Sequence, residues 1–590
     1  MFGIIIVWFT NLVRAIRNGW RRLLRRRVDY VRLEIGGALP EFTAAPRWWQ
    51  RRFLGMREPT SLHGLRRKLD RIAADPRASG VIVKISGLAA GWATLQSLRD
   101  ELGRFRQSGK RVVAYLLTTD TPGYYAACAA DEIVIPPTAF LTIVGLRAEV
   151  QFLKDALAKV GLTAEVEAVS PYKAVGEPFV RSDISPENRA QLERLLDLRF
   201  AEIVRAIGAA RRLADDAVRA AIDAAPLSAP AALDRGLVDG LCYEDELEAH
   251  LAGPAAEDTE NTEEGAPSQI RNRPSDSSMS SGAKSRSKGP IILDWDAARR
   301  ALRLPTARHY RKLVAVVPVE GTIAAGPSRN VPAPIPLVGG QQAGADSVAQ
   351  ALRQVERNRR VAAVVLYVNS RGGDAFASDL MWREVLRVRQ SKPVVVAMGD
   401  VAASGGYYIA APASAIVAQP GTLTGSIGVV SLRPILAGLL ERAGVNTVVL
   451  SRGAHSGLLS ISQPPSEDER QALRNLIFAS YHEFMRRVRE GRSMTEQHLD
   501  PIAGGRVWMG QEAIELRLVD QLGGLPEALL RAQELAGLPQ DRAAPLLLAR
   551  GDRGRLPPQP FPAGGLLDLW PMLEEALRPR IWAVLPFDEF

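Results

Sequence analysis

The sequence predicts an α/β protein made of two tandem copies of one domain, joined by a flexible linker. In each half of the chain, short β-branched runs alternate with longer stretches of helical periodicity, the order expected when helices pack on a mostly parallel sheet. The two halves also resemble each other in sequence, on either side of a segment with almost no large apolar residues.

The repeat is clearest in two stretches that align without a gap. GYYAACAADEIVIPPTAFLTIVG, from Gly123, aligns with GYYIAAPASAIVAQPGTLTGSIG, from Gly406. Upstream, VIVKISG aligns with VVLYVNS, and GKRVVAYL aligns with SKPVVVAM. Downstream, SPENRAQLERLLDLRFAEIVRAI aligns with SEDERQALRNLIFASYHEFMRRV. Self-similarity over this length indicates a gene duplication.

The chain of 590 residues is too long for a single core, and its composition indicates where it divides. Residues 253–289 are rich in Ser, Gly, Pro and charge, which predicts a flexible linker. We therefore expect a basic, membrane-proximal segment at 1–30, an N-terminal repeat at 31–252, this linker, a C-terminal repeat at 290–540 and a tail at 541–590.

The elements of the C-terminal repeat follow in strand–helix–strand order. VAAVVLYVN is a continuous apolar run of the kind buried in a parallel sheet. ASDLMWREVLRVRQ has helical periodicity, and PVVVAMG predicts the next strand. In such folds the functional residues lie at the carboxyl ends of the strands.

Charge is concentrated at the N-terminus of a chain whose net charge is +10. Residues 1–27 hold seven arginines and no acid, after the apolar start MFGIIIVWFTNLV. This start is shorter than the roughly 20 residues of a membrane-spanning helix, so it indicates a helix lying in a membrane interface, with a solvated basic helix as the alternative. No stacking aromatics accompany the charge, so no nucleic-acid partner is expected. Two cysteines and six scattered histidines predict neither a disulfide framework nor a metal site.

Three features of the C-terminal repeat could carry chemistry. Ser404 follows the strand PVVVAMG and opens the run GGYYIAAP, so it lies at a strand-to-helix turn, where a nucleophile is exposed and negative charge is favoured. Gly372 and Gly373 end the preceding strand, and with Gly405 they could direct N–H groups at an oxyanion. Ser426 lies in the hydroxyl-rich loop GTLTGSIG, which could equally be a tight turn.

The N-terminal repeat lacks all three features. Thr121 replaces Ser404, LAA replaces RGG, and Ile143 replaces Ser426. It holds instead SPYKAVGEPF, with Lys173, where the C-terminal repeat reads SRGAHSG. The nucleophile and its base are therefore expected to be divided between the repeats, with Lys173 made neutral by burial, since a free lysine has a pKa of about 10.4.

His455, in SRGAHSG, is the alternative base for Ser404. A serine–histidine pair needs a carboxylate to orient the imidazole, and the flanking residues supply none. A solvated loop histidine is the alternative interpretation of this residue.

The motifs VNSRGGDAFAS, MGDVAASGGYYIA, GTLTGSIGVV, GRVWMGQEAIELRLVD and YKAVGEPF together resemble the signal peptide peptidase A family in its long, duplicated bacterial form. The resemblance covers roughly residues 31 to 535. It implies a fold similar to Clp proteases and crotonases, with ββα units stacked into a superhelix, and a serine–lysine dyad that needs no cofactor.

Carried over by motif, the resemblance makes Ser404 the nucleophile, Lys173 the general base and Ser426 the group that orients the lysine. Gly372 and Gly405 form the oxyanion hole, and Gly373 supports the turn. The resemblance also implies a homo-tetramer associated with the bacterial inner membrane. Its substrates are cleaved signal peptides and other apolar, extended peptides.

Two other functions remain compatible with the sequence. A crotonase-like acyl-CoA enzyme would use paired N–H groups on a thioester, and predicts a carboxylate at the site and no role for Ser404. A membrane-associated scaffold without activity predicts that Ser404→Ala changes no phenotype. The serine endopeptidase is the function that the motifs favour.

Overall fold

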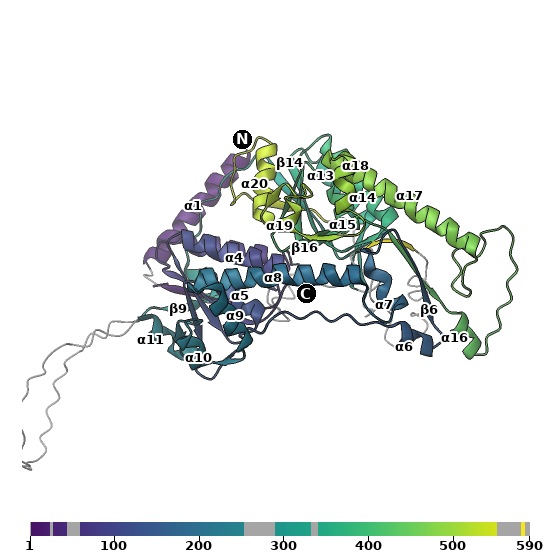
Figure 1. The fold of residues 1–590 in the computed structure, drawn as a ribbon. Helices are drawn as coiled ribbons and strands as arrows, with labels where there is room; N and C mark the ends of the chain where they lie inside the picture. The colour runs from purple at the N-terminus through teal and green to yellow at the C-terminus, as the bar shows by residue number, and fades with distance from the viewer. Residues whose placement is uncertain are drawn as a thin grey trace, which may run out of the picture. The chain divides into compact units, whose positions relative to one another are not determined.

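The computed structural model describes residues 2–23, 27–43, 53, 59–252, 289–331, 340–551 and 580–584 (Figure 1). The chain forms two compact units. Unit 1 comprises Met1–Ala89, Glu101–Val144 and Ala209–Ala307, and unit 2 comprises Ala90–Asp100, Gly145–Gly208 and Arg308–Phe590. Most of the predicted linker, residues 253–288, lies outside the described residues, as does most of the predicted C-terminal tail.

Unit 1 contains a parallel sheet of six strands in the order β8-β4-β3-β2-β1-β9. The strands are β1 (Tyr30–Ala38), β2 (Gly80–Ala89), β3 (Arg111–Leu116), β4 (Glu132–Ile135), β8 (Gly240–Leu241) and β9 (Ile292–Asp294), with a small antiparallel pair, β5 (Phe140–Leu141) and β7 (Leu227–Ser228). Its helices include α1 (Phe2–Leu23), α3 (Leu62–Ala73), α5 (Thr121–Ala127), α9 (Asp215–Asp223), α10 (Ala229–Asp234), α11 (Leu247–Ala252) and α12 (Trp295–Ala301).

Unit 2 contains two sheets. The first has the order β20-β18-β16-β14-β10-β22, and β17 and β21 extend it from β16. Its strands are β10 (Leu313–Glu320), β14 (Val361–Ser370), β16 (Val394–Ala403), β17 (Ala415–Ala418), β18 (Leu423–Gly425), β20 (Val507–Met509), β21 (Gln521–Leu522) and β22 (Leu546–Leu548). All of its pairings are parallel except that of β18 with β20.

The second sheet of unit 2 has the order β12-β13-β11-β15-β23-β19-β6. Its strands are β6 (Thr163–Ala168), β11 (Thr322–Ala324), β12 (Arg329–Val331), β13 (Gly340–Gly344), β15 (Gly372–Asp374), β19 (Val430–Ile435) and β23 (Arg580–Val584). The longer helices of the unit are α13 (Ala345–Arg357), α14 (Ala375–Arg389), α17 (Glu467–Arg492) and α20 (Leu525–Leu535), and α15 (Gly405–Ala410) follows β16.

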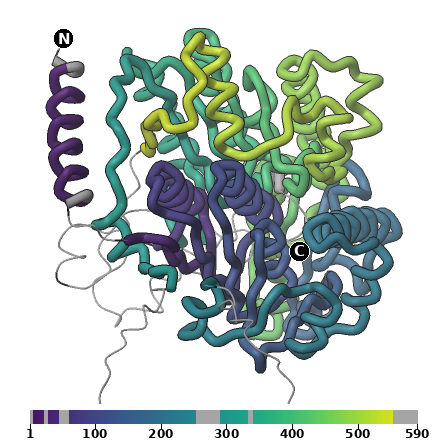
Figure 2. Tube along the Cα trace, turned by 90° about the vertical axis from the view of Figure 1, so that its left-hand side faces the viewer, coloured from purple at the N-terminus to yellow at the C-terminus, as the bar shows by residue number. Residues whose placement is uncertain are grey.

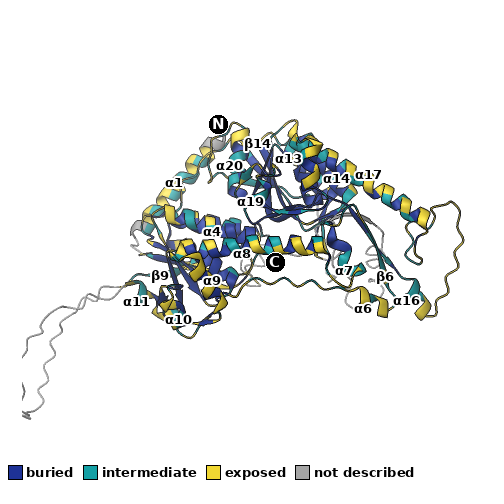
Figure 3. Cartoon of the chain, viewed as in Figure 1, coloured by how far each residue is buried: buried dark blue, intermediate teal, exposed yellow. Residues whose placement is uncertain are grey.

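The core of unit 2 explains its apolar strands. Every residue of β16 is buried, and the interior residues of β14 are nearly all buried, as Figure 3 shows in dark blue. Valines that face both sides of a parallel sheet are covered by α13, α14 and α20. The predicted run at 361–369, the helix at 377–390 and the strand at 393–399 correspond to β14, α14 and β16. The predicted α/β class is therefore confirmed.

The compact units do not coincide with the sequence repeats. β6 belongs to the N-terminal repeat, yet it pairs antiparallel with β19 of the C-terminal repeat, from Ala168 opposite Val430 to Thr163 opposite Ile435. β9 lies beyond the linker, yet it pairs with β1. Helices α4 (Trp92–Gln107) and α8 (Pro186–Arg211) begin in one unit and end in the other. The first repeat thus contributes a long segment, residues 145–208, to the unit that contains Ser404.

Candidate active site

Ser404 lies at a sharp turn between β16 and α15. Its backbone has φ 55° and ψ −115°, a combination that residues other than glycine rarely adopt. Its N–H donates to the carbonyl of Gly425 at 2.8 Å, and its own carbonyl accepts from Tyr408 at 2.8 Å. Both bonds hold the turn in place, so the strain is fixed by the surrounding fold. The side chain is fully buried, so the expectation that a serine at this turn is exposed was wrong: the surrounding fold covers it.

Lys173 reaches Ser404 because the segment that carries it is pinned on both sides. Upstream, β6 is a strand of the second sheet. Ser170 donates its hydroxyl to the carbonyl of Gly504, and the N–H of Lys173 donates to the carbonyl of Ser170 at 3.1 Å. The guanidinium of Arg506 covers the ring of Tyr172 at 4.0 Å. Downstream, Lys173 is followed at once by the 3₁₀ turn Ala174–Gly176.

The Lys173 amine makes three contacts, all with serine residues. Its Nζ lies 2.7 Å from Ser404 Oγ, 2.9 Å from Ser426 Oγ and 2.9 Å from the carbonyl oxygen of Ser426. Ser426 is fully buried and has φ 49°, and its N–H donates to the carbonyl of Arg506 at 2.7 Å. Ser404, Lys173 and Ser426 therefore form one buried cluster, drawn from both repeats.

The electrostatics of this cluster favour a neutral amine. Lys173 is 1% exposed, and burial away from water lowers its pKa well below the ordinary value because a charged ammonium is poorly solvated there. No carboxylate bonds Lys173, Ser404 or Ser426 within the described part of the chain. A lysine that is desolvated and unpaired can accept a proton near neutral pH.

The candidate oxyanion donors come from two places. Gly405 is the first residue of α15, where an N–H has no acceptor within the helix. Gly372 has φ 99°, and its N–H donates to Ser370 Oγ at 3.1 Å. Gly373 has φ 159°, and a Cβ there would lie 2.0 Å from the carbonyl oxygen of Ile323. Only glycine therefore fits at Gly373, which lets β15 lie close to β11.

Two glycines that the sequence analysis did not single out shape the lysine's channel. A Cβ at Gly505 would lie 2.8 Å from Lys173 Cβ, and one at Gly428 would lie 3.4 Å from Lys173 Cδ. The N–H of Gly505 donates to the carbonyl of Ile427 at 2.8 Å, next to Ser426. Gly428 ends the motif GTLTGSIG, and Gly505 begins the motif GRVWMGQEAIELRLVD. Their role depends on Lys173, which is far away in sequence. Ser370, which holds Gly372, was likewise missed.

His455 does not join the cluster. It is exposed in the loop after α16 (Ala437–Arg442), and its backbone carbonyl accepts from the N–H of Leu458 at 3.1 Å. The lysine, and not the histidine, is the base within reach of Ser404. In the part of the chain that the structure describes, no group of three or more His, Cys, Asp or Glu side chains is arranged to hold a metal ion.

An extended backbone lies along the glycine strand. β23 pairs antiparallel with β15, with Val584 opposite Gly372 and Ala583 opposite Gly373. It also pairs antiparallel with β19, with Trp582 opposite Val430, and it lies against α15. The gap between β15 and β19 is thus wide enough for one strand, next to the turn that carries Ser404.

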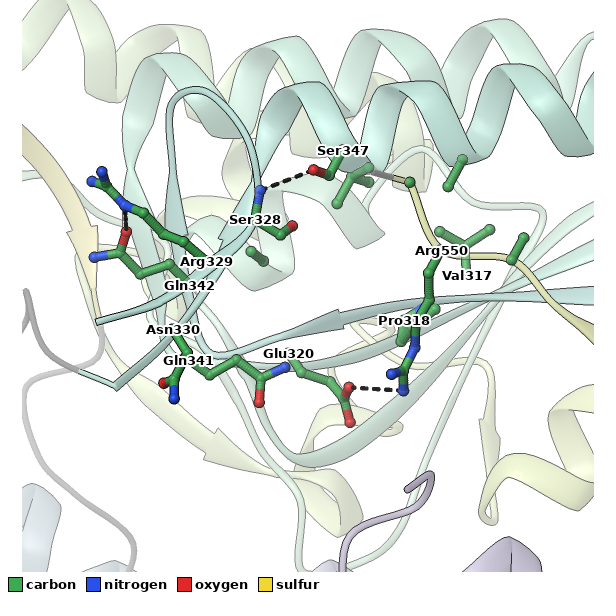
Figure 4. A pocket seen from close by; sticks show the side chains of 15 residues that line it. Val317, Pro318, Glu320, Ser328, Arg329, Asn330, Gln341, Gln342, Ser347 and Arg550 are labelled. Atoms are coloured by element: carbon green, nitrogen blue, oxygen red, sulfur yellow. Dashed lines mark hydrogen bonds and ion pairs between the residues drawn. The ribbon is translucent and has the colours of Figure 1, made fainter. Parts of the chain in front are cut away.

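A separate cavity of about 260 Å³ lies in unit 2 between β10, the β12–β13 hairpin and α13 (Figure 4). Its wall is polar. Ser328 N–H donates to Ser347 Oγ at 2.9 Å, and Arg329 Nε donates to Gln342 Oε1 at 2.8 Å. None of Ser404, Lys173 and Ser426 lines it, so this cavity is not the cluster described above.

The known proteins with similar sequences include peptidases. Residues 104–256 and 387–539 each match peptidase family S49, at equivalent places in the two repeats. The chain is 31% identical to "Serine protease SPPA, chloroplastic" of Arabidopsis thaliana, over 82% of this chain and 67% of that one. It is 30% identical to "Protease 4" of Haemophilus influenzae, over 80% of this chain and 72% of that one.

Among solved structures, a ClpP1 mutant from Listeria monocytogenes overlaps at 12% identity with a TM-score of 0.21, over 37% of this chain and 95% of that one. An overlap this small adds nothing to the assignment. The sequence matches carry it, and they confirm both the duplication and the resemblance drawn from the motifs. This chain belongs to peptidase family S49 and is a serine protease.

Proposed function

We propose that the protein is an endopeptidase in which Ser404 is the nucleophile and Lys173 the general base. The observation that carries this proposal is the distance of 2.7 Å between Lys173 Nζ and Ser404 Oγ in a fully buried site. A base must lie within hydrogen-bond reach of the proton it removes, and this pair satisfies that requirement.

The contacts of the amine support a direction for the proton. A carbonyl oxygen only accepts, so the bond to the Ser426 carbonyl uses one N–H of Lys173. A neutral amine can spend its second N–H on Ser426 Oγ, at 2.9 Å. Its lone pair then faces Ser404 Oγ, which donates to it. Ser426 thus acts as a positioning residue for the base.

The reaction is an acyl transfer. As Ser404 Oγ attacks the peptide carbonyl, its proton passes to Lys173. The N–H groups of Gly405 and the Gly372–Gly373 pair stabilise the oxyanion, for which the Gly372 N–H exchanges its bond to Ser370 Oγ for one to the substrate. The ammonium returns the proton to the leaving amine. Water then gives a proton to the Lys173 amine and attacks the acyl-enzyme. Lys173 returns this proton to Ser404 Oγ as the acid is released.

The position of β23 supports extended peptides as substrates. A substrate backbone that replaces β23 would form a strand between β15 and β19. Its main-chain hydrogen bonds would give affinity, and every second side chain could be recognised for sequence specificity. The chain's own strand has to leave for this. Removing residues 552–590 should therefore raise kcat/KM for a short peptide several-fold, and an unchanged value would contradict this role of β23.

The substrates and assembly follow the family resemblance. We propose that the peptides are cleaved signal peptides and other apolar segments at a membrane surface, and that the protein is a homo-tetramer. Exposed apolar side chains on the loop after α16 and on α17 support an interface between copies: Val448, Val449, Leu450, Leu476 and Phe478. Light scattering should give four times the chain mass, and Val448→Asp/Leu450→Asp should lower it.

The test of the dyad is hydrolysis of a fluorogenic apolar peptide by wild type, Ser404→Ala and Lys173→Ala. Each variant should lose at least about a thousandfold in kcat. Two matched controls should stay near wild type: Thr121→Ala, at the equivalent turn of the other repeat, and Lys392→Ala, whose amine bonds the backbone carbonyls of Val355 and Asn358. Activity that survives in folded Ser404→Ala would sink the mechanism.

A further inference from the structure

The helix α1 has two unlike faces. Along one side, Asn11, Arg14, Asn18 and Arg21 recur at the spacing of one helix stripe, and all four are half-buried. The opposite side is apolar and open, as Figure 3 shows largely in yellow. Its side chains are between 39% and 64% exposed: Ile5, Ile6, Trp8, Phe9, Leu12, Val13, Ile16 and Trp20.

The polar stripe is bonded to the backbone of residues 302–307, within unit 1. Asn11 Nδ2 donates to the carbonyl of Ala307 at 3.0 Å, and Asn11 Oδ1 accepts from its N–H at 2.7 Å. Asn18 brackets Leu304 in the same way, at 3.0 and 2.9 Å. Arg14 and Arg21 donate to the carbonyls of Pro305 and Leu302, each at 2.6 Å.

These bonds fix which face of α1 looks outward. The two asparagines are seven residues apart, two turns on the same side, so the helix lies along the 302–307 segment (Figure 2). Its apolar stripe is then turned away from the segment that holds it. Within the described residues, no helix is long and apolar enough to cross a membrane.

A cluster of arginines flanks this apolar stripe. Arg17, Arg21, Arg71, Arg299 and Arg300 line one open depression together with Trp20. Arg71 packs its guanidinium over Trp295 at 5.8 Å, donates to the carbonyls of Arg299 and Leu302, and has a buried Nε without a hydrogen bond among the described residues.

Charge in the depression is poorly compensated. Burial and then the positive charges of Arg21, Arg299, Arg17 and Arg14 lower the pKa of Arg71. Nearby carboxylates offset the positive charge in part: Asp75 bonds Arg77, which does not line the depression, at 2.8 Å, and Asp296 pairs with one lining arginine, Arg299, at 3.2 Å. Like charges held this close are stabilised by an anion that several of them can share.

We propose that α1 lies flat on a bilayer of anionic phospholipid, with its apolar stripe in the headgroup–acyl boundary and lipid phosphates on the arginine cluster. The exposed tryptophans of α1, Trp8 and Trp20, suit the headgroup–acyl boundary, and the arginines beside the apolar stripe can reach the lipid phosphates. This names the lipid for the membrane surface proposed above, and it does not depend on the chemistry at Ser404.

The test is co-sedimentation of the full chain with vesicles of phosphatidylcholine alone or with phosphatidylglycerol added. Binding should appear with the anionic lipid and weaken with salt. Arg17→Gln/Arg300→Gln removes two arginines without a hydrogen bond among the described residues and should weaken binding about 30-fold, at about 1 kcal/mol each. The matched control Arg205→Gln/Arg235→Gln removes the same charge at exposed sites on α8 and after α10, and should weaken it far less.

A second pair of measurements separates the alternatives. Trp8→Ser/Phe9→Ser should abolish vesicle binding while circular dichroism stays unchanged, since both side chains are exposed. Equal binding to neutral and anionic vesicles would overturn the proposal. So would full binding by Arg17→Gln/Arg300→Gln or by Trp8→Ser/Phe9→Ser. So would a drop in the mass of Trp8→Ser/Phe9→Ser without vesicles, because another copy would then cover the stripe.

The outcome is independent of the peptidase assay. Ser404→Ala should bind vesicles as wild type does, and Arg17→Gln/Arg300→Gln should cleave a soluble peptide at the wild-type rate. A chain that cleaves peptide and ignores vesicles would refute the lipid site alone. Millimolar glycerol phosphate should compete weakly at best, and full displacement by it would show a free phosphate site instead.

Discussion

The same strand-to-helix turn occurs once in each repeat, and the two copies are built differently. After β3, Asp120 caps α5 with φ −70° and accepts from the N–H of Gly123 at 2.8 Å. The Thr121 hydroxyl donates to the carbonyl of Val144 at 2.7 Å. After β16, Ser404 has φ 55° and caps nothing, and its hydroxyl meets Lys173 instead.

The comparison shows what each repeat keeps after duplication. The first turn satisfies its polar groups locally and relaxes its backbone. In the second turn, the Ser404 hydroxyl bonds no carbonyl among the described residues. The backbone of Ser404 is strained and is held by its bonds to Gly425 and Tyr408. The first repeat has Thr121 at this turn, and its Lys173 lies in unit 2, the unit that contains Ser404.

The largest effect outside the dyad is expected at the glycine strand. The equivalent of Gly373 in the first repeat is Ala90. Gly373→Ala would push a Cβ into the Ile323 carbonyl and displace β15, so activity should fall at least about a hundredfold, the value of one oxyanion donor. Ala90→Gly, the matched control, should leave kcat near wild type. Steady-state kinetics with a folded-state check by circular dichroism measures both.

Removing the Ser426 hydroxyl should have the next largest effect on rate. Ser426→Ala keeps the carbonyl contact of Lys173 and loses the one to Oγ, so the amine can turn away from Ser404. We expect kcat to fall about tenfold to a hundredfold with KM little changed. Ser431→Ala, a buried serine of β19 outside the cluster, serves as control. An equal loss in both variants would mean that Ser426 matters for packing only.

The buried lysine should make stability depend on pH. Desolvation holds the pKa of Lys173 below that of the unfolded chain, about 10.4. Between the two values the unfolded chain binds one proton more, so stability rises with pH and the full gain is reached only above the unfolded pKa. Activity likewise falls as the pH drops through the folded-state pKa.

Lys173→Met therefore tests that linkage. The variant should be more stable than wild type at neutral pH, and the difference should shrink by about 1.4 kcal/mol per pH unit as the pH approaches 10. Urea denaturation at several pH values gives the difference in the free energy of unfolding. A difference that does not change with pH would mean that the folded lysine stays charged.

The smallest effect concerns backbone strain, and its sign should reverse between the repeats. At Ser404 a positive φ favours glycine, so Ser404→Gly should be about 1 kcal/mol more stable than Ser404→Ala. Thr121 is the first residue of a regular helix, so Thr121→Gly should be less stable than Thr121→Ala by a similar amount. Thermal melting of the four variants measures this, and the same order at both positions would argue against strain at Ser404.

Local patterns were enough to predict the strands and helices around Ser404. Unbroken valine-rich runs have few alternatives to a buried parallel strand, and β14 and β16 form where they were expected. The repeat alignment also drew attention to Lys173, which has no counterpart in SRGAHSG. It does not select this lysine alone, because Lys84 aligns with Tyr367, and the motif YKAVGEPF supplied the rest of the assignment.

The exchange of segments between the repeats could not be predicted. The pairing of β6 with β19 depends on contacts between residues more than 250 positions apart, as the partners Ala168 and Val430 show. The same holds for Gly505, which has φ 86° and leaves room for Lys173, a residue far away in sequence. The place of β23 between β15 and β19 is equally invisible in a tail whose sequence shows only that it is apolar.

The most direct test of the account is labelling with a fluorophosphonate probe, followed by mass spectrometry of the modified peptide. Wild type should be labelled at Ser404, and Lys173→Met, with the fold intact, should react at least about a hundredfold more slowly. Thr121→Ala should be labelled at the wild-type rate. Label on another residue, or a rate at Ser404 that is unchanged in Lys173→Met, would contradict a nucleophile and base divided between the two repeats.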